Sequence, residues 1–154
     1  MIRIKKSMRT LEVIAPSGEI VFSCSVSLGK CPTGAKTQEG DMKTPEGIYR
    51  ITHKNFKSKY HIALGVSYPS RKDALLALKE KRIRRIQAIG IYACDLIRVR
   101  PSWKTPLGGF IMIHGEHPDH LSGDWTAGCI AVKNEEIEAI EKFVKCGENV
   151  EILP

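Results

Sequence analysis

Short runs of alternating apolar and polar residues recur along this chain, and such alternation is typical of strands with one buried face. Residues 2–14 alternate in this way and predict a strand or a hairpin. Residues 19–28 predict a partner strand after the Pro/Ser/Gly turn at residues 16–18. Residues 48–53 predict another strand and residues 150–153 a short final one. The pattern therefore predicts a fold built largely from strands.

Helical spacing of apolar residues begins near Ser70. The helix predicted there has good helix formers and places Ala74, Leu75 and Leu78 on one face. A second helical or mixed stretch is expected at about residues 84–99. Basic residues cluster where the two stretches meet, at Lys79, Lys81, Arg82, Arg84 and Arg85.

A third helix is predicted after Val132. Asn134 is a favourable N-cap, Glu135 and Glu136 suit the positive end of the helix dipole, and Gly147 is a suitable stop. The apolar stripe of this helix consists of Ile137, Ile140 and Val144. With the strands, these helices predict an α+β fold, mainly β, and the length of 154 residues predicts one domain over residues 1–154.

The composition is ordinary for a globular protein, with few aromatic residues, so the core must rest on Ile, Leu and Val. The formal net charge of +7 favours an anionic partner: nucleic acid, an acidic membrane surface or an anionic cell-wall polymer. The basic cluster is either a solvated helix face or a docking surface for wall polymer. No recognition motif supports nucleic acid, so none is expected as a partner.

No apolar run approaches the length of a membrane span, and the N-terminus does not resemble a signal peptide. Either the protein is cytosolic or an export segment is absent from this chain. The five cysteines include no CxxC pair, which disfavours a structural zinc site and a thioredoxin-like redox role. Cys24 and Cys31 are predicted to form a disulfide in an exported protein, or to be two buried thiols.

The stretch from Phe110 to Val132 carries the candidate chemistry. Two apolar runs flank a loop rich in Gly, Pro, Asp and Ser, and they predict two strands that lie side by side. His114 ends the first run, and Cys129 stands fifteen positions later at the start of the second. This arrangement brings an imidazole and a thiol to one end of a sheet.

A thiol near a base is a potential nucleophile, with His114 as the general base and Cys129 as the attacking group. Gly115 allows a sharp turn, so its carbonyl is expected to orient the imidazole through Nδ1. The backbone N–H groups of Ala127, Gly128 and Cys129 are candidates for an oxyanion hole. The alternative is structural: a buried cysteine on a strand and a hydrogen-bonded edge histidine.

Two other interpretations of this stretch concern its remaining polar residues. His114, His117 and His120 recur every third position near two aspartates, but without a helix this spacing is a weak metal signal, and no metal or cofactor is expected. The favoured interpretation is that these histidines and aspartates form a polar flap over a substrate groove beside Cys129. Trp125 either packs under the loop or forms a wall of the acyl pocket.

Several motifs in one order resemble the L,D-transpeptidase catalytic domain of the YkuD family. His114-Gly115, a loop, and then Thr126 to Cys129 before an apolar strand carry the resemblance, which covers nearly the whole chain. Residues 44–49 (TPEGIY) resemble the family's TPxG stretch. Ser67-Tyr68-Pro69 and residues 124–132 (DWTAGCIAV) resemble the YafK-like branch. Many members have His and Arg or Asn where this chain has Ala127 and Ala131.

The resemblance implies a β-sandwich-like domain of mixed sheets with two or three flanking helices. It also implies a peptidoglycan enzyme in the cell envelope, in the periplasm or extracellular wall. Cys129 would attack the L,D peptide bond of a stem peptide and form a thioester, with cross-linking, carboxypeptidase or hydrolase outcome. Thr126, Trp125 and Tyr68 would line the substrate groove, and the protein is expected to be a monomer. The alternative is a non-catalytic cell-wall-binding module of the same fold.

Overall fold

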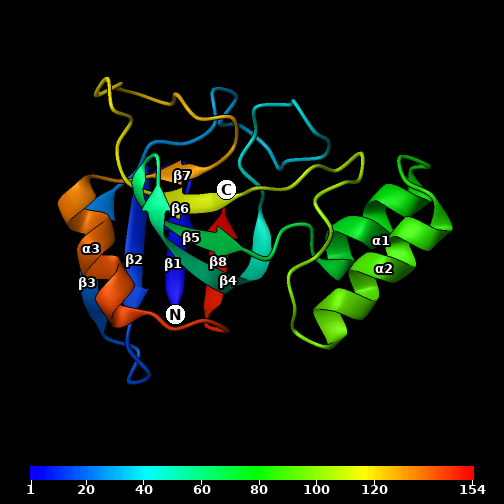
Figure 1. The fold of residues 1–154 in the computed structure, drawn as a ribbon, viewed down its shortest axis with the longest axis horizontal. Helices are drawn as coiled ribbons and strands as arrows, with labels where there is room; N and C mark the ends of the chain where they lie inside the picture. The colour runs from blue at the N-terminus through cyan, green and yellow to red at the C-terminus, as the bar shows by residue number, and fades with distance from the viewer.

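The computed structural model describes all 154 residues, and eight of its segments form one mixed sheet in the order β3-β2-β1-β8-β4-β5-β6-β7 (Figure 1). The strands are β1 (Ile2–Lys5), β2 (Thr10–Ile14), β3 (Ile20–Ser25), β4 (Gly47–Ser58), β5 (His61–Val66), β6 (Met112–His114), β7 (Ile130–Ala131) and β8 (Asn149–Leu153). The helices are α1 (Arg71–Lys79), α2 (Arg85–Leu96) and α3 (Asn134–Phe143).

The long strand β4 joins the two halves of the sheet. Its first residues pair with β8 and its later residues pair with β5, in both cases antiparallel. On one side, β8 continues through the parallel strand β1 to the hairpin of β1 and β2 and then to β3. On the other side, β5 pairs with β6, which is parallel to β7. The predicted N-terminal hairpin is therefore confirmed.

The sheet curls until its two edges meet. After β3, Ser27 and Ala131 exchange two backbone hydrogen bonds of 2.8 Å, and Gly29 bridges to Thr126. The chain that leaves one edge strand thus pairs with the other edge strand, β7. Since one sheet folds over itself and three helices flank it (Figure 1), the expected sandwich-like mixed-sheet fold of α+β, mainly β class is confirmed.

The core lies inside this curl and consists mainly of Ile, Leu and Val side chains, as predicted. A single cluster of 26 buried residues extends from the sheet to all three helices. Alternation sets its geometry: β1 buries Ile2 and Ile4, and its parallel partner β8 buries Val150 and Ile152. Tyr49 and Tyr68 are the largest fully buried side chains, and their rings meet edge to face with centroids 6.0 Å apart.

Helix α1 begins as predicted, because the Ser70 hydroxyl and the Asp73 carboxylate form a reciprocal capping box. The predicted face was wrong in one respect. Ala74 and Ala77 are buried, whereas Leu75 is 70% exposed. The small alanines belong to the core cluster, whereas Leu75 lines an open groove between α1 and α2. Helix α2 confirms the second predicted helical stretch. None of the three helices combines the length and the apolar composition that a membrane span requires.

Helix α3 confirms the third predicted helix but not its predicted cap. The N-cap is Lys133, whose backbone N–H donates to the Glu136 carboxylate over 2.7 Å. Asn134 instead accepts a hydrogen bond from the Glu116 backbone N–H over 3.0 Å, which ties the helix start to the end of β6. The helix ends at Phe143, four residues before Gly147. Ile137 and Ile140 form the buried stripe, as expected.

Strand β5 and the far half of β4 were not predicted. Residues 54–61 carry three lysines and no alternation of apolar and polar residues, so they contain no strand signal. The half of β4 after His53 is largely exposed and leaves the core. Tertiary pairing with β5 holds this segment extended, which local patterning does not report.

The segment of residues 29–47 contains no helix or strand before β4 begins at Gly47, and it forms a long loop. Lys6, which follows β1 and is only 2% exposed, anchors this loop. Its ammonium donates to the Gly34 carbonyl over 2.6 Å, to the Thr44 carbonyl over 3.1 Å and to the Glu46 carboxylate over 2.7 Å. All three donor positions of the ammonium are therefore satisfied, and the loop is fixed against β1.

Replacing Lys6 with Met is predicted to lower the free energy of unfolding by about 3 kcal/mol, because it leaves the Glu46 carboxylate without its buried partner. The double variant Lys6→Met/Glu46→Gln should recover part of that loss. Urea unfolding of both variants measures the effect. Glu80→Gln breaks the exposed ion pair with Arg82 and should change stability by less than about 1 kcal/mol. Equal losses for Lys6→Met and Glu80→Gln would contradict the proposed anchor.

Candidate active site

Strands β6 and β7 lie side by side, as predicted from the apolar runs (Figure 1). Their parallel register pairs Ile113 with Ile130 and His114 with Ala131. Ile113 and Ile130 are fully buried in the core. Because side chains alternate along a strand, His114 and Cys129 both project to the opposite face of this pair. The fold thus places the imidazole and the thiol on one side of two adjacent strands.

The His114 ring is 2% exposed and its Nδ1 lies 2.8 Å from the carbonyl oxygen of Gly115. A carbonyl only accepts hydrogen bonds, so Nδ1 carries the hydrogen and Nε2 holds the free lone pair of the neutral ring. Burial lowers the pKa of His114, the hydrogen bond to Gly115 acts against this, and the charge of Lys59 lowers the pKa further. The ring is therefore a neutral base at neutral pH.

Aromatic rings hold this imidazole in place. Tyr60 stacks on it with centroids 4.4 Å apart and an interplanar angle of 19°, and Trp125 lies 5.6 Å away at a tilt. His117 packs edge-on against Trp125 at 5.2 Å. Sequence reasoning missed Tyr60, because it occupies the turn between β4 and β5, far from His114 in the chain and outside any motif.

Gly115 is required by crowding rather than by a special backbone angle. A Cβ atom at this position would lie 2.3 Å from the Asn134 amide oxygen and 2.7 Å from the Tyr60 carbonyl oxygen. The Gly115 N–H donates to the same Tyr60 carbonyl over 3.0 Å. The residue that accepts from His114 is thus itself fixed between α3 and the β4–β5 turn.

The Cys129 sulfur lies 3.3 Å from the Phe110 carbonyl oxygen, to which the thiol donates. Burial raises the pKa of this thiol, although the Met112 N–H and the charges of Lys36 and Lys59 act in the opposite direction. The resting group is therefore a thiol and not a thiolate. Phe110 has a left-handed φ of 57°, which is uncommon for a bulky residue and accompanies the carbonyl contact.

A tight turn presents Cys129, and Thr126 builds it. The buried Thr126 hydroxyl donates to the Cys129 carbonyl over 2.7 Å and accepts from the Gly128 N–H over 3.1 Å. The hydroxyl of Thr126, a residue expected to line the substrate groove, is thus used within the turn, and so is the Gly128 N–H, one of the three expected oxyanion donors. The N–H groups of Ala127 and Cys129 stay candidates for an oxyanion hole.

Gly128 is the residue on which this turn depends. Its φ is 129°, and a Cβ atom there would lie 2.6 Å from the Lys43 carbonyl oxygen. Gly29 packs against the same region, since its Cβ would lie 2.1 Å from the Met42 carbonyl oxygen. The loop of residues 29–47 therefore lies directly against the turn that carries the thiol.

The sequence model of the YkuD family, which is described as the L,D-transpeptidase catalytic domain, matches residues 1–152 of this chain. The chain belongs to the YkuD family. YafK of Escherichia coli K12, which bears a provisional name as an L,D-transpeptidase, is 26% identical over 148 residues, covering 93% of this chain and 46% of YafK. The chain thus spans about half the length of this relative.

Solved structures share the YkuD fold. The helical cell shape determining protein Pgp2 of Campylobacter jejuni superimposes with a TM-score of 0.68 and 25% identity, covering 98% of this chain and 46% of Pgp2. L,D-transpeptidase 1 of Mycobacterium tuberculosis gives a TM-score of 0.54 at 14% identity, covering 99% of this chain and 60% of that protein. The latter similarity concerns the fold alone.

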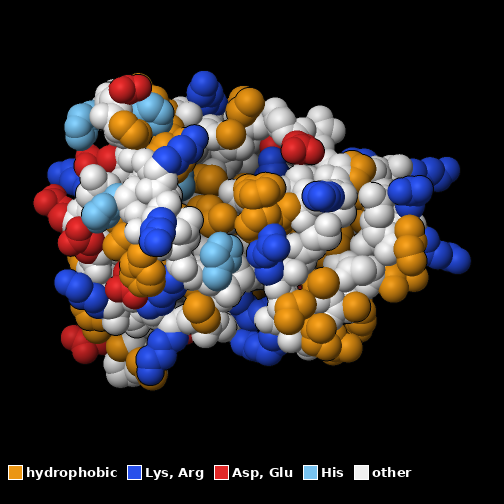
Figure 2. Space-filling model, in the orientation of Figure 1, with side chains coloured by type: hydrophobic (Ala, Val, Ile, Leu, Met, Phe, Trp, Pro, Cys, Tyr) orange, Lys and Arg blue, Asp and Glu red, His pale blue; other side chains and the backbone are white.

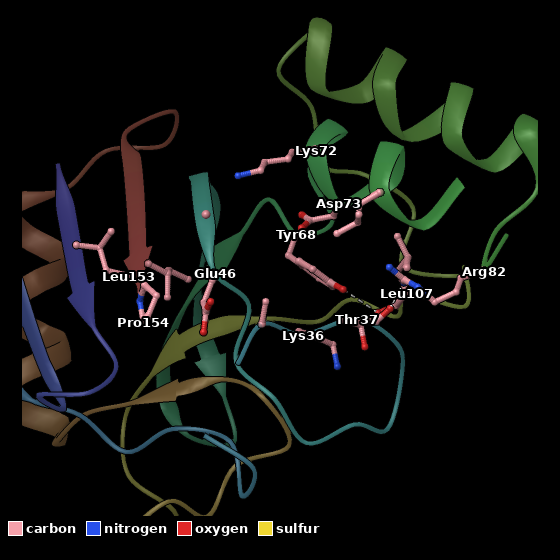
Figure 3. A pocket seen from close by; sticks show the side chains of 14 residues that line it. Lys36, Thr37, Glu46, Tyr68, Lys72, Asp73, Arg82, Leu107, Leu153 and Pro154 are labelled. Carbon is pink, nitrogen blue, oxygen red and sulfur yellow. Dashed lines mark hydrogen bonds between the residues drawn. The ribbon is translucent and has the colours of Figure 1, made fainter. Parts of the chain in front are cut away.

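Tyr68, expected in the substrate groove of this YkuD domain, is fully buried and donates to the Leu107 carbonyl over 3.2 Å (Figure 3). It lines a pocket of about 390 Å³ that neither His114 nor Cys129 lines. The pocket carries charges of both signs, from Lys36, Lys72, Arg82, Glu46 and Asp73. Lys36, which lies in the loop of residues 29–47, lines this pocket, and its charge also lowers the pKa of Cys129. The loop is therefore shared by the pocket and by the turn that carries the thiol.

The residues considered as metal ligands or as a disulfide pair lie apart in this YkuD-family chain. His114, His117 and His120 do not converge, and no three His, Cys, Asp or Glu side chains are grouped as a metal site. All five cysteines are free thiols, so Cys24 and Cys31 form no disulfide here. Burial raises the pKa of Cys24 to about 12, whereas Cys31 is exposed, so they are not two buried thiols.

Alkylation by iodoacetamide should report the protonation state of Cys129. Because burial raises its pKa, the rate at this residue should rise with pH to a midpoint above that of free cysteine. Mass spectrometry of the peptide around Cys129 resolves it from the four other thiols, and Cys129→Ser gives the background. A midpoint below that of free cysteine would instead indicate a preformed thiolate.

Gly128→Ala should lower the free energy of unfolding by about 2 kcal/mol or more, because alanine at this φ is strained and its Cβ meets the Lys43 carbonyl. Thermal or urea unfolding measures the loss. The neighbouring exposed residue provides a control, and Ala127→Ser should change stability by less than about 0.5 kcal/mol. A fully stable Gly128→Ala protein would show that the turn adopts another shape.

Proposed function

We propose that this YkuD-family chain modifies peptidoglycan in the cell envelope as a cysteine acyltransferase acting on the L,D peptide bond of stem peptides. One observation carries the proposal: His114 donates through Nδ1 to Gly115, which leaves Nε2 free on the face of the β6–β7 pair that also presents Cys129. A neutral base beside a neutral thiol is the starting state of general-base-assisted attack on a carbonyl. Family membership supports the substrate class.

In the first half-reaction, Nε2 of His114 takes the thiol proton as the Cys129 sulfur attacks the carbonyl carbon of the third stem residue. The oxygen of that carbonyl becomes an oxyanion, and the N–H groups of Ala127 and Cys129 are the proposed donors to it. The C–N bond to D-alanine then breaks. The His114 imidazolium returns its proton to the departing amine, so D-alanine leaves and a thioester remains on Cys129.

In the second half-reaction, the same imidazole takes a proton from the acceptor as the acceptor attacks the thioester. An amine of a neighbouring stem gives a cross-link, and water gives a shortened stem. The Cys129 sulfur leaves and recovers its proton from His114. Attack of the thiol on an existing cross-link, followed by water, gives the hydrolase outcome. All of these outcomes share one thioester and differ only in which bond is opened and which acceptor attacks.

The surroundings of the pair suit this cycle. Burial of both groups disfavours charge in the resting state, so the thiol and imidazole meet neutral and become charged only during attack. Lys36 and Lys59 favour the anionic sulfur and the oxyanion without touching the thiol. Tyr60 and Trp125 hold the imidazole plane while it changes protonation state. Ala127 and Ala131 supply no polar side chain, so backbone donors must dominate the contacts of the acyl group.

Acylation by a carbapenem tests the nucleophile; imipenem is bound in a solved structure of the L,D-transpeptidase LdtMt1. The intact protein should gain the mass of the drug, and Cys129→Ala should abolish the adduct. Cys31→Ala, which removes an exposed thiol elsewhere, should acylate like the unmodified chain. Intact-mass spectrometry over time measures each rate. The absence of an adduct on folded protein, or its survival in Cys129→Ala, would contradict the proposed nucleophile.

His114→Gln should slow this acylation by about 10²–10⁴-fold, because the base that accepts the thiol proton is lost. His120→Gln is the matched control, since His120 is well exposed and lies in the neighbouring loop. Equal rates for the two variants would remove His114 from the mechanism. Incubation with defined muropeptides, read by mass, then identifies the bond that is opened and the acceptor.

A further inference from the structure

The hairpin formed by α1 and α2, residues 71–100, carries most of the net charge of the chain. It contains nine Lys and Arg and three Asp and Glu, so six of the seven net positive charges lie within these 30 residues. The other 124 residues hold fifteen basic and fourteen acidic side chains and are almost neutral. A cationic field is therefore localised on this hairpin instead of spread over the protein.

The same hairpin also exposes large apolar side chains. Ile86 is 68% exposed, Ile89 57% and Leu96 70%, and their spacing of three and seven residues places them on one side of α2. Ala88 and Ile91, on the other side of the helix, are buried in the core. Helix α2 thus has two apolar faces, of which only one is used by the fold. Further exposed apolar residues of the hairpin are Leu75, Leu76, Tyr92, Ile97 and Val99.

An apolar groove of about 210 Å³ runs between the two helices. Leu75 and Leu78 of α1 face Ile89 and Tyr92 of α2 across it, with Ala74 and Ala88 at its floor and Arg71 and Arg85 as its charged lining. In Figure 2 the orange side chains gather over the hairpin at the lower right, with blue Lys and Arg side chains beside them. Apolar surface and cationic groups therefore share one face of the protein.

Charge and apolar exposure together restrict what this face can dock on. A second copy of the chain would set two strongly cationic hairpins against each other, which is unfavourable. An anionic wall polymer satisfies the positive charges but gains nothing from exposed Ile and Leu. An anionic lipid surface satisfies both, since acyl chains receive apolar side chains while phosphates attract Lys and Arg. We propose that the α1–α2 hairpin docks this protein on anionic phospholipid bilayers.

The hairpin is held rigidly enough for docking to orient the whole domain. Arg50 of β4 pairs with Asp95 of α2 over 2.9 Å, and the Tyr49 hydroxyl donates to Asp73 of α1 over 3.2 Å. Both contacts connect the helices to the central strand of the sheet. The groove and the exposed stripe include none of the residues around His114 and Cys129, so a docked protein keeps its thiol outside the lipid contact.

Vesicle flotation with the whole chain tests this proposal. Vesicles of phosphatidylcholine alone should leave the protein unbound, whereas vesicles with about 30% phosphatidylglycerol should carry it upward. Ile86→Ser/Ile89→Ser should weaken that binding roughly tenfold by removing the apolar contact. Arg84→Glu/Arg85→Glu should weaken it by roughly tenfold or more through charge reversal at the surface. All substituted side chains are exposed, so acylation by carbapenem should continue and verify folding.

Two matched controls separate the hairpin from general properties of the chain. Ile48→Ser removes an apolar side chain of similar exposure on β4, and Lys57→Glu/Lys142→Glu makes the same charge change outside the hairpin. Both should bind vesicles like the unmodified chain. If Ile86→Ser/Ile89→Ser binds vesicles like the unmodified chain while Arg84→Glu/Arg85→Glu binds weakly, charge alone drives binding. That result would indicate docking of the kind expected for an anionic polymer and would overturn the proposal. Self-association that the serine pair abolishes, without any vesicle binding, would overturn it in favour of a dimer.

Discussion

The parallel pairing of β6 with β7, locked by the Ser27–Ala131 bridge, is the constraint on which the site depends. Without it, His114 and Cys129 are two residues fifteen positions apart on either side of a loop. With it, alternation buries Ile113 and Ile130 and turns the imidazole and the thiol to the same face. Closure of the sheet also presses the loop of residues 29–47 onto the turn that carries the thiol. The pairing that closes the sheet therefore also brings the residues of the site together.

Burial sets the resting protonation state of His114 and Cys129. Desolvation lowers the proton affinity of the buried imidazole and makes the half-buried thiol hold its proton more firmly, so both effects favour the neutral pair over an ion pair. The Phe110 carbonyl stabilises the thiol, and the Gly115 carbonyl stabilises the Nδ1–H form of the ring. The positive charges of Lys36 and Lys59 act in the opposite direction on the thiol and favour negative charge on its sulfur.

Local patterning was sufficient for the elements that bury a regular face. The N-terminal hairpin, the three helices and the pair of strands around the candidate chemistry followed from it. It failed where tertiary contacts decide: residues 54–58 are extended because β5 pairs with β4, and Asn134 accepts from the Glu116 N–H instead of capping α3. His-Gly and Gly-Cys spacing was sufficient to select His114 and Cys129 as candidates, and strand pairing turns both side chains to one face. Tyr60 and the Phe110 carbonyl were not, because spatial proximity alone brings them to the site.

The central claim is that His114 rests as a neutral ring with its hydrogen on Nδ1, beside a protonated Cys129. Nitrogen-15 NMR of histidine-labelled protein at neutral pH measures this directly, because protonated and unprotonated ring nitrogens resonate far apart. We expect one protonated nitrogen, Nδ1, and one unprotonated nitrogen, Nε2, assigned by comparison with His114→Gln. Two protonated nitrogens would reveal an imidazolium that cannot take the thiol proton, and a hydrogen on Nε2 alone would remove the lone pair from that nitrogen; either result contradicts the claim.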